Sequence, residues 1–283
     1  MTHHDKPILT AKEAALTAVF AALIVIITRL RGIPIIFGVQ TATIEFSVPL
    51  YPLAGILLGP WIGALAVLIG NLVSWIIPKT TVFGLLLVPA GAFAALTAGF
   101  LARKSRWANW KFSAITLTLL IILWYTTPVG FEAPFYPFFL HIPALALILI
   151  FRGKIFDFLN GTSKKLVTLG VAITSFAGVM ADQMWGNLMF ITALNFVFDL
   201  KAFRNSLRNI GMTITLGFPW KDPFPSWMHD MIANPTLGDL FMLYVPITAI
   251  ERTIFTIIAT IVGVAIIMSV GRIFFATHPK REK

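Results

Sequence analysis

The sequence lacks cysteine altogether and is poor in charged residues. Without cysteine, disulfide bonds and thiolate metal sites are excluded. Only 12% of the 283 residues are charged, whereas a soluble domain carries about 25%. Hydrophobic residues make up 58% of the chain, above the roughly 45–50% of soluble proteins. A soluble fold of this length could not bury so much apolar surface, so the composition indicates a protein embedded in a membrane.

Several sequence motifs of enzymes are also missing. The chain has no G-x-x-x-x-G-K-[ST] phosphate loop, no G-x-S-x-G and no H-E-x-x-H. His141 and His229 have no second ligand at the spacing of a metal site. We therefore expect no catalytic residue, no bound metal and no cofactor.

The net charge of +10 is carried by short basic clusters between apolar runs. With the N-terminus in the cytoplasm, fourteen of the 22 lysines and arginines fall inside, at the two chain ends and in the loops 102–111 and 152–165. This distribution follows the positive-inside rule of membrane proteins. We therefore expect both termini in the cytoplasm, an even number of spans, and no nucleic-acid partner.

The apolar runs predict an all-α bundle of about eight transmembrane helices, with six to eight as the range. A span needs roughly 20 apolar residues. The predicted spans are 13–31, 44–58, 60–77, 82–101, 112–129, 135–151, 166–187 and 249–271. We expect a single bundle over 1–283 in the plasma membrane, with a long extracellular or interfacial segment at 188–248.

Polar and helix-breaking residues interrupt the apolar run at 41–77. They are Glu45, Pro49, Pro52, the pair Gly59-Pro60 and Asn71. A charge or a broken helix at membrane depth is tolerated where protein or a water-filled cavity surrounds it. This run therefore predicts part of a polar cavity, which is typical of transport proteins.

Further polar residues fall in the predicted outer half of the bilayer. The helical rise places Asp182 and Arg29 about 24 Å, and Glu251 about 30 Å, from the inner ends of their spans. Such groups can form an outward-facing pocket, or each can be an interface residue that pairs with Arg29, Arg31 or Arg252. The candidate solute-binding residues are Glu45, Asn71, Trp75, Asp182, Gln183, Trp185, Asn187, Glu251 and Arg29.

Small residues recur at helical spacing in several of the runs. The first span has Ala14, Ala18 and Ala22, and IEFSVPLYPLAGILLGPWIGALAVLIGNLVSWI contains the pattern G-x-x-x-GP-x-x-G. With VPAGAFAALTAGFLARKSR and AIERTIFTIIATIVGVAII, these segments resemble the substrate-binding S components of energy-coupling factor (ECF) vitamin transporters. Family members are usually shorter and have fewer spans, so the resemblance does not extend over residues 112–248.

The resemblance implies a solute-binding subunit that captures a micronutrient, a vitamin or its precursor, from outside. Uptake would then be driven by partner ATPase subunits. In that family, small residues on the first helix dock on a transmembrane coupling subunit, a role that Ala14, Ala18 and Ala22 would take here.

Two other functions remain open on the sequence. A stand-alone secondary transporter would use Asp182 or Glu251 to carry a proton or a sodium ion. An integral membrane enzyme acting on lipids would use the same two residues as paired carboxylates. The sequence does not name the solute.

Overall fold

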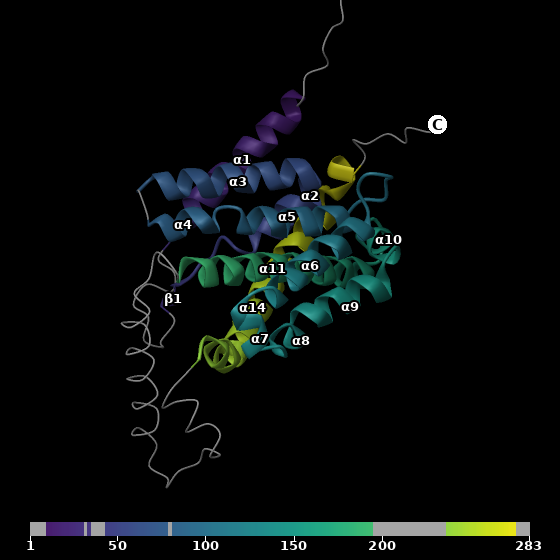
Figure 1. Ribbon diagram of the computed structural model, residues 1–283. Helices are drawn as coiled ribbons and strands as arrows, with labels where there is room; N and C mark the ends of the chain where they lie inside the picture. Colours follow the sequence, from purple (N-terminus) through teal and green to yellow (C-terminus); the bar gives the residue numbers. More distant parts are fainter. Residues whose placement is uncertain (1–9, 31–32, 35–42, 79–80, 195–235, 276–283) are drawn as a thin grey trace, which may run out of the picture.

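The computed structural model describes residues 10–30, 33–34, 43–78, 81–194 and 236–275. Over these residues the chain is a bundle of helices (Figure 1). The helices are α1 (Ala11–Ile27), α2 (Leu50–Leu58), α3 (Pro60–Ile76), α4 (Val82–Leu87), α5 (Ala90–Leu101), α6 (Trp110–Tyr125), α7 (Pro128–Glu132), α8 (Tyr136–Phe139), α9 (His141–Phe151), α10 (Lys154–Leu159), α11 (Lys164–Ala193) and α14 (Leu237–Phe275). Two strands of two residues each, β1 (Ile33–Pro34) and β2 (Thr43–Ile44), pair antiparallel.

Three segments are long and apolar enough to cross a membrane, namely Val82–Leu101, Lys164–Ala193 and Leu237–Ser269. Shorter apolar helices are Pro60–Ile76, Trp110–Tyr125 and His141–Phe151. The helical membrane character predicted from the sequence agrees with these findings. The number of spans and their orientation in the bilayer stay predictions.

Several boundaries differ from those predicted. The second run becomes helical only at Leu50, because residues 43–44 pair as a strand and Pro49 occupies the N-cap. The sixth run is divided at Leu140 into α8 and α9. The predicted outer segment 188–248 is shorter, since α11 continues to Ala193 and α14 already begins at Leu237. The remainder of that segment, 195–235, lies outside the described residues.

The two basic loops lie at the same end of the bundle. Lys104, just after α5, approaches Asp157 of α10 with its Nζ 3.5 Å from the carboxylate. At the other end, Thr28 and Ser74 place the end of α1 beside the end of α3, with 2.9 Å between their hydroxyl oxygens. The helices thus run between an end with basic loops, which the sequence predicts to be cytoplasmic, and an opposite end.

The crossing of α2, α3 and α5 brings backbones into direct contact. A Cβ on Gly55 would collide with the Ala95 carbonyl group, and one on Gly99 would lie 2.5 Å from Pro60 Cα. Gly59, between α2 and α3, has φ 90°, a conformation that side chains disfavour. The Gly59-Pro60 break therefore belongs to a close-packed crossing, and the polar groups described below lie elsewhere.

Arg103 stabilises the crossing of α2, α3 and α5 at the end of the bundle with the basic loops. Its guanidinium donates to the carbonyl oxygens of Ile56 at 3.1 Å and Leu57 at 3.3 Å, in the last turn of α2. Burial lowers the pKa of Arg103 to about 10, so the group stays charged at neutral pH. A cation at the C-terminal end of a helix also interacts favourably with the helix dipole.

Candidate binding site

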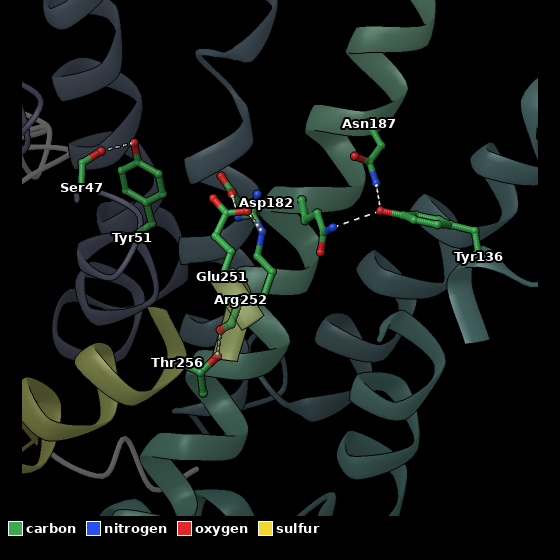
Figure 2. A network of polar contacts seen from close by, with 9 residues as sticks. Ser47, Tyr51, Tyr136, Asp182, Asn187, Glu251, Arg252 and Thr256 are labelled. Carbon is green, nitrogen blue, oxygen red and sulfur yellow. Dashed lines mark hydrogen bonds and ion pairs between the residues drawn. The ribbon is translucent and has the colours of Figure 1, made fainter. Parts of the chain in front are cut away.

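The centre of the site is an arginine between two carboxylates. Asp182 lies on α11, about 27 Å along that helix, and its side chain is 10% exposed. Arg252 of α14 donates from Nη1 to Asp182 Oδ2 at 3.1 Å. The neighbouring Glu251 places Oε2 3.8 Å from Arg252 Nε. Figure 2 shows the three charged side chains converging between the two helices.

The segment that leads into α2 adds a third carboxylate and a phenol. Glu45 is exposed and interacts electrostatically with Asp182, Arg252 and Glu251. Tyr51, 4% exposed, shares a hydrogen bond of 2.9 Å with Ser47 and also interacts with Glu45 and Asp182. Among the described residues, three acids therefore surround one arginine, and their charges sum to a negative value.

A second polar group lies on the other side of Asp182. Gln183 Nε2 and Asn187 Nδ2 both donate to the hydroxyl of Tyr136, at 3.0 and 2.9 Å. The two amides are four residues apart and so share one face of α11. Tyr136 in turn stacks on Trp124, with 4.7 Å between ring centroids. Figure 2 shows Tyr136 and Asn187 to the right of the charged cluster.

Three of the predicted binding residues donate to backbone carbonyl groups around α4, and one of them, Asn71, also interacts with the hydroxyl of Tyr51. Asn71 Nδ2 donates to Val88 O at 3.2 Å. Trp75 Nε1 donates to Thr81 O at 2.9 Å, and Trp185 Nε1 to Leu86 O at 3.0 Å. Trp185 also stacks on Phe93 at 4.5 Å. In this structure these side chains fix the α4 segment between α3 and α11.

Arg29 is not brought to the charged cluster. Its side chain is exposed, and Nη2 donates to Ser74 O at 3.3 Å at the end of α3. The reason is the packing of α1, which lies mainly against α3 rather than α11. Arg252 is therefore the counter-charge of Asp182 in the structure.

Two tyrosines belong to the site although the sequence analysis did not select them. Tyr51 and Tyr136 are both 4% exposed, and each binds polar partners at the level of Asp182. The chain has only four tyrosines, so their rarity in an apolar sequence was an available signal. A buried phenol usually needs a hydrogen-bond partner for its hydroxyl.

The small-residue face of α1 lies on the outside of the bundle. Ala14, Ala18 and Ala22 are exposed, whereas Phe20 and Ile24 on the same helix are buried. Within the described residues, no group of three or more histidines and acids could hold a metal ion.

Comparison with known proteins gives one relative and one family. The chain is 38% identical over 142 residues to the uncharacterized protein MJ0923 of Methanocaldococcus jannaschii. The matched residues make up 50% of this chain and 46% of the relative. The chain thus spans about half the length of that relative. No solved structure matches. The family model described as "ECF transporter, substrate-specific component" matches residues 12–181. This match confirms the resemblance noted in the sequence, and the chain belongs to the family of substrate-specific components of ECF transporters.

Proposed function

We propose that this chain captures a small water-soluble micronutrient, a vitamin or its precursor, outside the cell for ATP-driven uptake. The observation that carries the proposal is the largely buried charged cluster of Asp182, Glu251 and Arg252 between α11 and α14. Ionisable groups inside membrane proteins are costly and commonly mark solute pathways. The chain would span the plasma membrane several times and bind solute without chemical conversion.

The solute would lie among groups that come from four parts of the bundle. Arg252 and Asp182 offer a donor and an acceptor of opposite charge, and Tyr51 and Tyr136 border them on two sides. Convergent polar groups beside aromatic rings are typical of sites for small organic molecules. The candidate residues that fix α4, such as Trp185, would shape this site through the backbone rather than through direct contact.

Energy for uptake would come from partner subunits that dock on α1. Ala14, Ala18 and Ala22 are exposed and follow one another at intervals of four residues. Small side chains at this spacing permit close approach of a second helix. A transmembrane coupling subunit would pack on this face and connect the chain to two ATPase subunits.

Replacement of Ala18 by tryptophan tests this function. The bulky side chain prevents close helix approach, so Ala18→Trp should abolish co-purification with the coupling and ATPase subunits and abolish solute uptake. The matched control is Leu23→Trp, because Leu23 is 39% exposed and its distance of five residues from Ala18 places it on another side of α1. Both variants should unfold at the wild-type temperature. Normal assembly and uptake by Ala18→Trp would contradict the proposal.

The Asp182–Arg252 pair also fits the second candidate, a stand-alone ion-coupled transporter. A carboxylate that exchanges its arginine for a proton or a sodium ion is a common arrangement in such proteins. Vesicles that contain only this chain separate the two functions. Uptake driven by an ion gradient in those vesicles would favour the second candidate, whereas dependence on the ATPase subunits and ATP favours the first.

A further inference from the structure

We infer that the solute of this site is an organic cation that carries N–H donors, such as an amidinium or a protonated nitrogen heterocycle. This inference rests on the proposed function and specifies its substrate class. It comes from the balance of charges and of hydrogen-bonding groups around Asp182.

The charge balance is negative. Within the part of the chain that the structure describes, Glu45, Asp182 and Glu251 act on one another and on one arginine, Arg252. Arg252 satisfies Asp182 at 3.1 Å, but its distance of 3.8 Å to Glu251 is too long for a hydrogen bond. One guanidinium can neutralise one carboxylate, so the cluster has a surplus of negative charge.

Surplus negative charge at this depth is relieved either by a proton on one of the carboxyl groups or by a ligand that carries positive charge. The side chains of Glu251 and Arg252 are each 15% exposed, and that of Asp182 is 10% exposed. Water therefore solvates them only in part, and an uncompensated carboxylate in such surroundings is costly. A ligand of positive charge would complete the pairing that Arg252 alone leaves incomplete.

A separate observation also indicates a donor ligand. Gln183, next to Asp182 and 4% exposed, has no hydrogen-bond partner for Oε1 among the described residues. Its Nε2 is held by Tyr136, whose hydroxyl oxygen also accepts from Asn187. This anchoring leaves Oε1 as a buried acceptor without a donor, and such an atom costs about 1–3 kcal/mol unless something binds it.

The cluster also contains a donor without a hydrogen bond, Arg252 Nε, but this single donor does not outweigh the surplus of acceptors. Arg252 Nε makes no hydrogen bond, yet it faces the Glu251 carboxylate at 3.8 Å. Among the described residues, the acceptors that remain are the carboxylate of Glu251 and the amide oxygen of Gln183, while Glu45 adds negative charge but already interacts with Ser47. A ligand that matches them must donate at several positions and carry positive charge.

Three small aromatic probes of nearly equal shape test the charge directly. Benzamidine is cationic at neutral pH and has N–H donors, benzamide is neutral, and benzoate is anionic. Each is added at the same millimolar concentration to the purified full-length protein, and thermal unfolding and equilibrium binding are measured. Benzamidine should raise the unfolding temperature and bind at least about tenfold more tightly than the other two probes.

Charge-removing variants then locate the binding. Glu251→Gln should weaken benzamidine binding at least about tenfold. Glu45→Gln, at an exposed position before α2, should act in the same direction and serves if Glu251→Gln does not fold. The control is Asp157→Asn, which removes an exposed carboxylate at the basic end of the bundle and should leave benzamidine binding unchanged.

Preference for benzoate or benzamide, or no response to any probe, would overturn the inference. So would equal effects of Asp157→Asn and Glu251→Gln. These outcomes differ from a failure of the proposed function. Benzamidine selectivity together with normal assembly of Ala18→Trp would contradict ECF-type uptake and leave the charge inference intact, whereas loss of assembly together with benzoate selectivity would do the reverse.

Discussion

The two halves of α11 meet the bundle in different ways. Before Asp182 the contacts are close and made by small residues, and a Cβ on Gly178 would lie 2.9 Å from the Ala94 carbonyl oxygen. After Asp182 the contacts are made by long polar side chains such as Gln183 and Asn187. At Gly186 a Cβ would meet only Leu87 Cδ2, at 4.0 Å, among the described residues.

The difference separates packing from binding on a single helix. Where backbones touch, no side chain can be exchanged for a ligand, and the first half of α11 is fixed by shape. In the second half the contacts are hydrogen bonds between side chains, and a solute can take the place of one partner or bind the groups that have none. Asp182 stands at the boundary between these two regions.

The largest effect is expected at the boundary between the two halves, where Asp182 pairs with Arg252 of α14. Arg252→Gln leaves the Asp182 carboxylate buried without its counter-charge, which typically costs about 3–5 kcal/mol. Denaturant unfolding of the purified protein in detergent should show this loss. Asp182→Asn in the same chain should restore part of the stability, because the unpaired charge is then removed as well.

Asp182→Asn alone separates a binding role from a structural one. If the carboxylate contacts solute, affinity should fall at least about tenfold, or roughly 1.4 kcal/mol. If it serves only as the partner of Arg252, stability should fall while affinity hardly changes. Unchanged affinity would remove Asp182 from the binding site.

A pair of glycine substitutions compares the two halves with the same chemical change. Gly178→Ala should destabilise by about 1–3 kcal/mol, since the added methyl group has to displace the backbone of α5. Gly186→Ala should be neutral or stabilise by up to about 1 kcal/mol, because alanine is the better helix former. Unfolding free energies of equal size for the two variants would show that the halves pack alike.

Loss of the Tyr136 hydroxyl should have a smaller effect. Tyr136→Phe leaves two amide groups without their common acceptor, and we expect a loss of about 1–2 kcal/mol. Tyr125→Phe is the matched control, since its hydroxyl makes a more exposed bond to Pro134 O, and it should cost a few tenths of a kcal/mol at most. Thermal unfolding of both variants measures the difference, and a control as costly as Tyr136→Phe would argue against the network.

The orientation of the bundle in the membrane can be tested without any effect on stability. The chain has no natural cysteine, so Ser105→Cys and Ser163→Cys introduce single thiols near the basic loops. In intact cells both should resist a membrane-impermeant thiol reagent, and both should react after permeabilisation. Labelling of either residue in intact cells would place the basic end outside.

The sequence predicts the charged centre better than its surroundings. Asp182, Glu251 and Arg252 stand out because charge is rare in an apolar chain, and helical rise alone places them at similar depth. The hydrogen bonds of Trp75 and Trp185 were not predictable, since their acceptors are backbone atoms whose positions depend on how α4 packs. Tyr136 and Gln183 are 47 residues apart, and no local pattern connects them.

The small-residue patterns were informative about shape but ambiguous about role. The pair Gly59-Pro60 indicated a broken helix, which the sequence analysis assigned to a polar cavity. In the structure Gly59 adopts the positive φ of the turn between α2 and α3, and Gly55 lets the backbones of α2 and α5 touch. A glycine satisfies either requirement, because a missing Cβ suits both a close crossing and a bend beside a cavity.

The hydrogen bonds of Arg103 connect the basic loop to the C-terminal end of α2. The loop that begins at Arg103 holds the last turn of α2 by its carbonyl groups. Tyr51 lies in the first turn of this nine-residue helix, about 9 Å along the axis from those carbonyl groups, and Glu45 precedes the helix. A rigid helix transmits displacement over such a distance with little loss. A force applied to the basic loop would therefore tilt the very segment that supplies a carboxylate and a phenol to the opposite end of the bundle.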